Sequence, residues 1–159
     1  MPDTAAKEIR DLESQIFELT QRLTELRQSA SGGRVPNYGF ATLEGDATLD
    51  DLFGDQDRLM LIHNMGQGCR YCTLWADGFN GLLPHLESVM SVVLVSKDPP
   101  ETQRRFANAR GWRFRLASHG GGDYISEQTV MDGESNMPGV VVYERSDGSI
   151  YRRDSAVFG

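Results

Sequence analysis

Cysteine is scarce in this chain of 159 residues, which contains only Cys69 and Cys72. A single close pair cannot form the framework of several disulfides that staples small secreted domains. Histidine is nearly as scarce, and His63, His85 and His119 form no His-x3–5-His pair. A zinc site at the cysteines would need two further ligands. A metal-binding module therefore stays an alternative, while the sequence predicts no metal and no other cofactor.

Long apolar runs and an excess of positive charge are also missing. No run approaches the ~18 apolar residues of a membrane span, so we expect no membrane partner. Only 16 Lys and Arg stand against 23 Asp and Glu, giving a formal net charge of −7. This balance disfavours a nucleic-acid partner, because phosphate binding relies on concentrated basic residues. The first residues lack the apolar core of a secretory signal, so we expect a cytoplasmic location, where an isolated cysteine pair points to catalysis or metal binding.

The two cysteines lie where a strand is expected to give way to a helix. They follow the apolar run 59–62 and open a helix-like segment, 72–80. Cys-x-x-Cys at such a turn is a redox motif. Unpaired backbone N–H groups at a helix N-terminus stabilise a thiolate, and Arg70 adds positive charge beside Cys69. Cys72 is then placed to close a disulfide, although two buried, inert thiols would show the same spacing.

The N-terminal segment is predicted to form one long helix over residues 5–28. Its apolar residues recur with 3,4 spacing, which is typical of a coiled-coil seam; they are Ile9, Leu12, Ile16, Leu19, Leu23 and Leu26. A parallel pair would set Glu8 against Glu13 and Arg22 against Arg27, so the charges favour an antiparallel homodimer. The same stripe would also suit a helix that packs on its own domain. We predict a helix at 1–30, a linker at 31–37 and a globular domain at 38–159.

Strands and helices alternate through the rest of the chain. Strands are expected at 35–42, 58–64, 91–96, 112–117, 140–143 and 150–151, and helical segments at 46–54, 72–90, 101–110 and 123–130. The last two strands are joined through Asp147-Gly148, a strong hairpin signal. This order predicts an α/β fold with a mixed central sheet and the cysteines at the carboxyl end of a central strand.

The order of these parts resembles the thioredoxin superfamily, which implies a three-layer fold. More closely, residues 36–159 resemble a bacterial thioredoxin-like family of unknown function whose members are described as predicted dithiol-disulfide oxidoreductases. The specific segments are Cys69-Arg70-Tyr71-Cys72, Trp75–Gly81 and Leu83–Leu86. The segment Val95–Asp98, with Phe106, Gly111-Trp112 and Phe114, is similar to the peroxiredoxin-like branch.

The resemblance implies roles for two further residues. Thioredoxins hold a cis-proline before a late strand, and Pro138 occupies the matching place, where it would guide the substrate backbone. His63, six residues before Cys69, stands where thioredoxins usually have a buried acid, and it would move a proton to or from Cys72. A trans proline and a core histidine are the plain alternatives at these positions.

The chain also departs from its relatives. Arg70 and Tyr71 replace the Gly-Pro of thioredoxins between the cysteines, and Trp75 is a candidate for an aromatic wall beside them. The Pro-x-x-x-Thr-x-x-Cys signature of peroxiredoxins is absent at both cysteines. We therefore predict a thiol–disulfide oxidoreductase acting on a protein or small-molecule disulfide or thiol. A peroxiredoxin-like thiol peroxidase and a non-enzymatic adaptor built on the N-terminal helix are the alternatives.

Overall fold

The computed structural model of this chain describes residues 2–30, 32–128 and 133–158. The chain divides into two compact units, Met1–Gly32 and Gly33–Gly159. The first unit is built on a single helix and the second holds the whole sheet, so each is described by itself.

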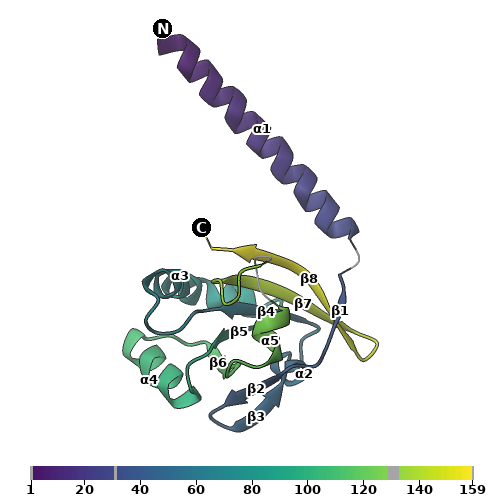
Figure 1. The fold of residues 1–159 in the computed structure, drawn as a ribbon, viewed down its shortest axis with the longest axis vertical. Coiled ribbons are helices and arrows are strands. Elements are labelled where there is room, and N and C mark those ends of the chain that lie inside the picture. The colour runs from purple at the N-terminus through teal and green to yellow at the C-terminus, as the bar shows by residue number, and fades with distance from the viewer. Residues whose placement is uncertain (1, 31, 129–132, 159) are drawn as a thin grey trace. The chain divides into compact units, whose positions relative to one another are not determined.

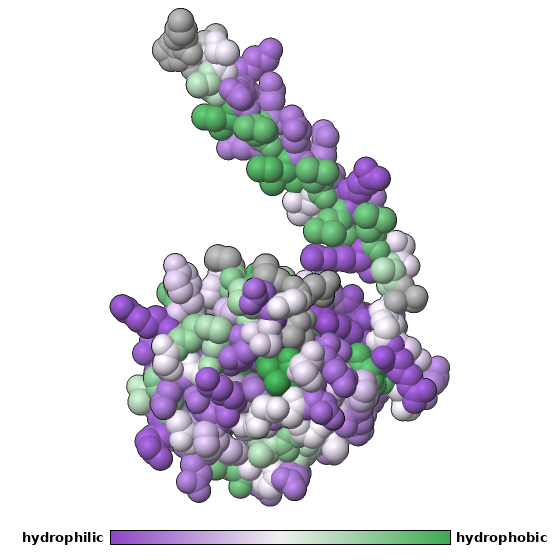
Figure 2. All heavy atoms as spheres, viewed as in Figure 1, coloured by the Kyte–Doolittle hydropathy of each residue, from purple (hydrophilic) through white to green (hydrophobic). Residues whose placement is uncertain are grey.

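The first unit contains helix α1, Pro2–Ser29, which is 28 residues long. The six seam residues predicted from the 3,4 spacing lie along this helix, and each has 47% to 65% of its surface exposed. Figure 2 shows hydrophobic residues following one another along this helix. Phe17 is similarly exposed, at 63%, but falls outside the 3,4 pattern. The helix therefore carries an apolar stripe that its own residues do not cover.

The second unit is a single curled sheet of eight strands flanked by short and long helices (Figure 1). The strands are β1 Arg34–Val35, β2 Gly39–Thr42, β3 Gly45–Thr48, β4 Arg58–His63, β5 Ser91–Ser96, β6 Arg115–Ser118, β7 Gly139–Ser146 and β8 Ser149–Val157. Their order is β1-β8-β7-β4-β5-β6-β2-β3, in which β4, β5 and β6 are parallel and the other pairs antiparallel. The predicted mixed sheet is confirmed.

Four helices complete this unit: α2 Leu49–Leu52, α3 Arg70–Glu87, α4 Pro100–Arg110 and α5 Asp123–Glu127. The alternation of side chains along β4 separates two cores. Leu59 and Leu61 pack on the side of α2 and α5, whereas Met60 and Ile62 pack on the side of α3 and α4. The unit therefore has three layers, with the sheet in the middle.

Several predicted elements differ in detail. Arg34 and Val35, expected in a linker, form β1 and pair with β8. The expected strand 35–42 is divided between β1 and β2, because β2 pairs with β3 and β6 at the opposite end of the sheet. The helical segment 72–90 is a single helix that starts two residues earlier and contains Pro84. A proline leaves one helix carbonyl without its usual donor, here that of Asn80, and the guanidinium of Arg113 donates to it at 3.4 Å.

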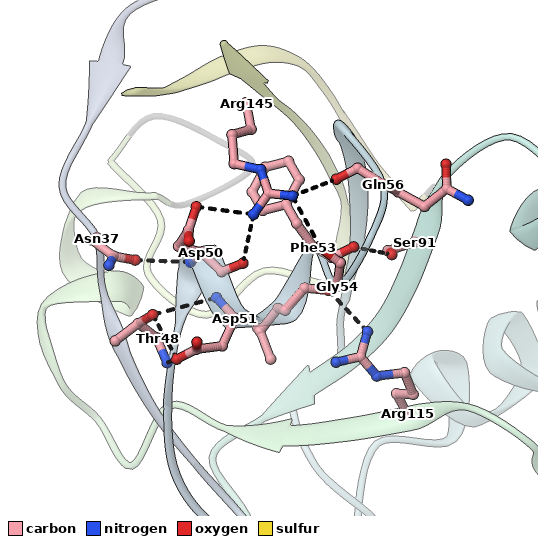
Figure 3. A network of polar contacts seen from close by, with 11 residues as sticks. Asn37, Thr48, Asp50, Asp51, Phe53, Gly54, Gln56, Ser91, Arg115 and Arg145 are labelled. Atoms are coloured by element: carbon pink, nitrogen blue, oxygen red, sulfur yellow. Dashed lines mark hydrogen bonds and ion pairs between the residues drawn. The ribbon is translucent and has the colours of Figure 1, made fainter. Parts of the chain in front are cut away.

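The amino end of the sheet is closed by a polar network around Arg145 of β7 (Figure 3). Its guanidinium donates to the carboxylate of Asp50 at 3.2 Å and to the carbonyl oxygens of Gly54 and Gln56 at 3.0 and 3.1 Å. The guanidinium also lies over the ring of Phe53, 5.1 Å from its centroid. These contacts fasten α2 and the following loop to the sheet, at the end opposite the two cysteines.

Candidate active site

Cys69 and Cys72 stand at the N-terminus of α3, directly beyond the carboxyl end of β4. Cys69 is the N-cap residue, and its Sγ accepts a hydrogen bond from the backbone N–H of Cys72 at 3.1 Å. The two residues form a disulfide with a Cα–Cα distance of 5.3 Å, within the usual range for such a bridge. Cys69 is half-buried, whereas Cys72 is only 2% exposed and its Sγ accepts from the backbone N–H of Met65. Cys69 is thus the more exposed of the two cysteines.

The loop that leads into the cysteines is held by two side chains that the sequence did not single out for a role. The carboxamide oxygen of buried Asn64 accepts from the N–H of Gly66 at 2.7 Å. Asp98, just after β5, accepts from the N–H of Gln67 at 2.7 Å. Gly66 has φ +115°, a conformation that favours glycine, and its carbonyl accepts from the N–H of Cys69 at 3.0 Å. The position of Cys69 is therefore set by a short chain of hydrogen bonds from the sheet.

An apolar groove of about 380 Å³ runs along the outer face of α3, immediately C-terminal to the cysteines. It is lined by Leu74, Trp75, Gly78, Phe79 and Leu82. Trp75 stacks on Phe158 with ring centroids 4.7 Å apart and an angle of 17° between the ring planes. Trp75 therefore lines this groove, and its role as an aromatic wall beside the cysteines stays a prediction. Arg70 and Tyr71, between the cysteines, are both exposed.

The Trp75–Gly81 segment also fixes α3 against its neighbours. The carboxylate of Asp77 accepts from the indole N–H of Trp112 at 2.7 Å and forms a bidentate ion pair with Arg110. The hydrogen bonds from Arg110 and Trp112 lower the pKa of Asp77, although partial burial opposes them. These contacts link the helix that carries the cysteines to the last residue of α4 and to Trp112.

His63 lies on the face of the sheet opposite α3. Its Nε2 donates to the amide oxygen of Asn136 at 3.0 Å, and its ring stacks on His119 with centroids 5.6 Å apart. Tyr124 lies 5.9 Å from His63 and 6.0 Å from His119, centroid to centroid. Among the residues that the structure describes, no hydrogen bond joins His63 to Cys72. Proton transfer between them stays a prediction, and the contacts found place His63 in a buried His–Tyr cluster.

Burial governs the ionisation of this cluster. Desolvation lowers the pKa of His63, and the hydrogen bond to Asn136 offsets part of the effect. Desolvation, together with the neighbouring His63 and Lys97, lowers the pKa of His119 to about 4. Burial raises the pKa of Tyr124. Both imidazoles are therefore neutral at pH 7. The cluster was missed because its members come from three segments that only the strand order brings together.

Pro138 lies at the start of β7, next to the carboxyl end of β4, because His63 pairs with Gly139. The peptide bond before Pro138 is trans, which was the plain alternative, since the described residues contain no cis peptide. The carbonyl oxygen of Pro138 accepts from the N–H of Phe158 at 3.0 Å. Contact between Pro138 and a substrate backbone remains a prediction, and Phe158, directly after β8, already bonds to this acceptor.

No three His, Cys, Asp or Glu side chains within the described ranges gather so that they could hold a metal ion. No helix in the same part of the chain has the length and apolar character needed to cross a membrane.

The parallel β4-β5-β6 core, the flanking helices and a Cys-x-x-Cys at the start of α3 define a thioredoxin-like α/β protein. The sequence of residues 3–156 matches the family described as bacterial protein of unknown function, DUF899. The chain belongs to this family. A search of curated proteins found no significant relative.

Solved structures with the same fold include several peroxiredoxins. Peroxidoxin BcpB from Mycobacterium tuberculosis is 21% identical with a TM-score of 0.65, covering 80% of this chain and 84% of its own. A peroxiredoxin-like protein from Aquifex aeolicus is 20% identical with a TM-score of 0.62, covering 82% and 77%. The bacterioferritin comigratory protein of Xanthomonas campestris is 16% identical with a TM-score of 0.63, covering 80% and 87%. Identities this low show the shared fold alone.

Proposed function

We propose that this protein is a thiol–disulfide oxidoreductase that works through Cys69 and Cys72. The observation that carries the proposal is the unequal exposure of two bonded cysteines at the start of an 18-residue helix. Cys69 is only half-buried and stands at the N-cap, where backbone N–H groups favour a thiolate. Cys72 is buried behind it and within reach of its sulfur. This arrangement supports attack by Cys69 and resolution by Cys72.

The reaction conserves atoms and electrons in two exchanges. In the reduced protein, the Cys69 thiolate attacks one sulfur of a substrate disulfide, and the other substrate sulfur leaves as a thiolate. The Cys72 thiolate then attacks Cys69 Sγ, which releases the second substrate thiol and closes the Cys69–Cys72 disulfide. Two electrons pass to the substrate, and an external dithiol or two glutathione molecules restore the protein. The same steps in reverse transfer a disulfide to a substrate dithiol.

The arrangement around the cysteines supports the proposal further. Hydrogen bonds from the N–H of Gly66 to Asn64 and from the N–H of Gln67 to Asp98 preorganise the loop before Cys69. The exposed guanidinium of Arg70 adds positive charge beside the sulfur that must become a thiolate. The apolar groove along α3 begins at Leu74, two residues after Cys72 in the sequence, and offers a surface for a substrate larger than a free thiol.

The proposal is tested by thiol counts across glutathione redox buffers and by reduction of a protein disulfide with dithiothreitol as electron donor. We expect one two-electron transition at about −120 to −270 mV, the range of known oxidoreductases. Cys69→Ser should abolish turnover, and Cys72→Ser should accumulate a mixed disulfide. Full turnover by the Cys69→Ser variant would show the assignment to be wrong.

A thiol peroxidase is the second candidate, favoured by the peroxiredoxin fold of the structural neighbours. The Cys69 thiolate would attack the O–O bond of a hydroperoxide, giving a sulfenic acid and water or an alcohol. The Cys72 thiol would then displace water from that sulfenic acid and form the disulfide. Consumption of hydrogen peroxide with dithiothreitol as reductant, far faster than by free cysteine and lost in Cys69→Ser, would favour this function over disulfide exchange.

A further inference from the structure

The stripe of α1 is an exposed apolar feature outside the candidate active site. It runs from Ile9 to Leu26, a length of about 26 Å at 1.5 Å per residue. Leu19, near its middle, is 65% exposed. Helix propensity alone contributes little to the stability of such a helix, because most helical stability in proteins comes from packing an apolar face. The stripe therefore calls for an occupant with the same length and spacing.

We propose that the occupant is α1 of a second copy, paired antiparallel as a two-helix coiled coil. In one register every seam residue meets a seam residue of the second copy. Ile9 then packs against Leu26, Leu12 against Leu23, and Ile16 against Leu19, with the same contacts repeated by two-fold symmetry. No seam residue is left unpaired at either end, so two antiparallel copies of the stripe overlap along their full length.

The charges beside the seam select this orientation. A parallel, in-register pair would set Glu8 against Glu13 of the second copy and repeat that repulsion by symmetry. In the antiparallel register, Glu13 faces Thr20 of the second copy and Gln15 faces Arg22. No like charges then meet across the seam. Charge repulsion beside the seam therefore destabilises the parallel pair, whereas the antiparallel pair has no such repulsion.

The oligomeric state of the full chain tests the pairing. We expect a dimer by sedimentation equilibrium, and we expect Leu19→Lys to raise its dissociation constant at least about 100-fold, because the central layers lose apolar burial twice. Phe17→Ser is the matched control, since Phe17 is as exposed as Leu19 but lies outside the seam. This control should leave the dimer unchanged. A monomeric wild-type chain, or equal effects of the two substitutions, would overturn the proposal.

Cross-linking tests whether the two α1 helices pair antiparallel, and it does not require a variant that folds as a monomer. In a chain carrying Cys69→Ser and Cys72→Ser, Ile9→Cys alone and Leu26→Cys alone should give no covalent dimer under mild oxidation. A refolded mixture of the two should give one, because each new thiol then meets the other across the seam. Self-linking of the Ile9→Cys variant would indicate parallel pairing and overturn the proposal. So would a mixture that does not link. The proposal is independent of the proposed function, because its tests do not require a working dithiol.

Discussion

The carboxylate of Asp98 lies against the backbone of Gly66, so that a Cβ placed on residue 66 would stand 3.0 Å from one of its oxygens. Gly66 also has φ +115°, a conformation that costs other residues about 1–3 kcal/mol. Gly66→Ala should therefore displace the loop that precedes Cys69. We expect a loss of about 1–3 kcal/mol of stability and a clear fall in disulfide-exchange rate.

Gly68→Ala provides the matched control in the same loop. A Cβ at Gly68 would meet nothing within 4 Å, and its backbone does not need glycine. Thermal unfolding of the oxidised proteins and single-turnover thiol exchange would compare the two variants. Equal losses in both would mean that the contact between Gly66 and Asp98 does not control the loop.

Much of this architecture could be predicted from local patterns. The apolar run at 59–62, the β-branched run at 91–96 and the Asp147-Gly148 turn each specify an element through nearby residues. In the structure Asp147 and Gly148 have φ of 51° and 70°, as a tight hairpin turn requires. The cysteines were found because their spacing and the strand before them are local signals.

The contacts that position the site depend on strand order and could not be predicted in the same way. Asp98 reaches the loop of Gly66 only because β5 lies beside β4. His63 meets His119 because β6 follows on the other side of β5. The possible cis state of Pro138 rested on resemblance alone, and nothing in the local sequence distinguishes cis from trans before a proline.

The buried histidines should make stability depend on pH. Because the pKa of His119 falls from its usual 6.5 to about 4, the unfolded chain binds a proton more readily than the folded chain. The stabilising contribution is complete above pH 6.5 and is lost as pH falls toward 4. His63 shifts in the same direction. We expect the melting temperature to fall across this window, and His119→Gln to reduce the dependence.

His85→Gln is the control for this experiment, because His85 lies exposed in the last turn of α3. Melting curves between pH 7 and 4 would be recorded for the three proteins, with the dithiol oxidised throughout. A pH dependence that is the same with and without His119 would contradict the assignment to this cluster.

The groove on α3 predicts discrimination between large and small substrates, provided that the protein is an oxidoreductase. Leu74 and Leu82 line the groove and are 65% and 53% exposed. Burying one leucine against a partner stabilises a complex enough that Leu74→Ser should lower kcat/KM for a protein disulfide about tenfold or more. The rate with a small aromatic disulfide should not change.

Val89→Ser is the matched control, because Val89 is 58% exposed but does not line the groove. Steady-state rates with the protein disulfide and the small disulfide would be measured for all three proteins. A parallel fall in both rates in Leu74→Ser would indicate damage to the dithiol rather than loss of a binding surface.

The Arg145 network predicts a stability effect at the end of the sheet remote from the cysteines. The planar guanidinium reaches Asp50 with one nitrogen and the carbonyls of Gly54 and Gln56 with the other. Lysine presents a single ammonium and cannot span these acceptors. Arg145→Lys should therefore lose hydrogen bonds to these carbonyls and destabilise the protein by about 1–2 kcal/mol, measured by urea unfolding.

Arg153→Lys is the control for replacing any ion-paired arginine by lysine. Arg153 pairs with Glu144 while both side chains remain more than one-third exposed, so its substitution should cost at most about 1 kcal/mol. Arg145→Lys should also leave the reduction potential of the dithiol unchanged, because its contacts lie at the opposite end of β4. A shifted potential would mean that strain at α2 is transmitted along the sheet to Cys69, and the two ends could then no longer be treated as independent.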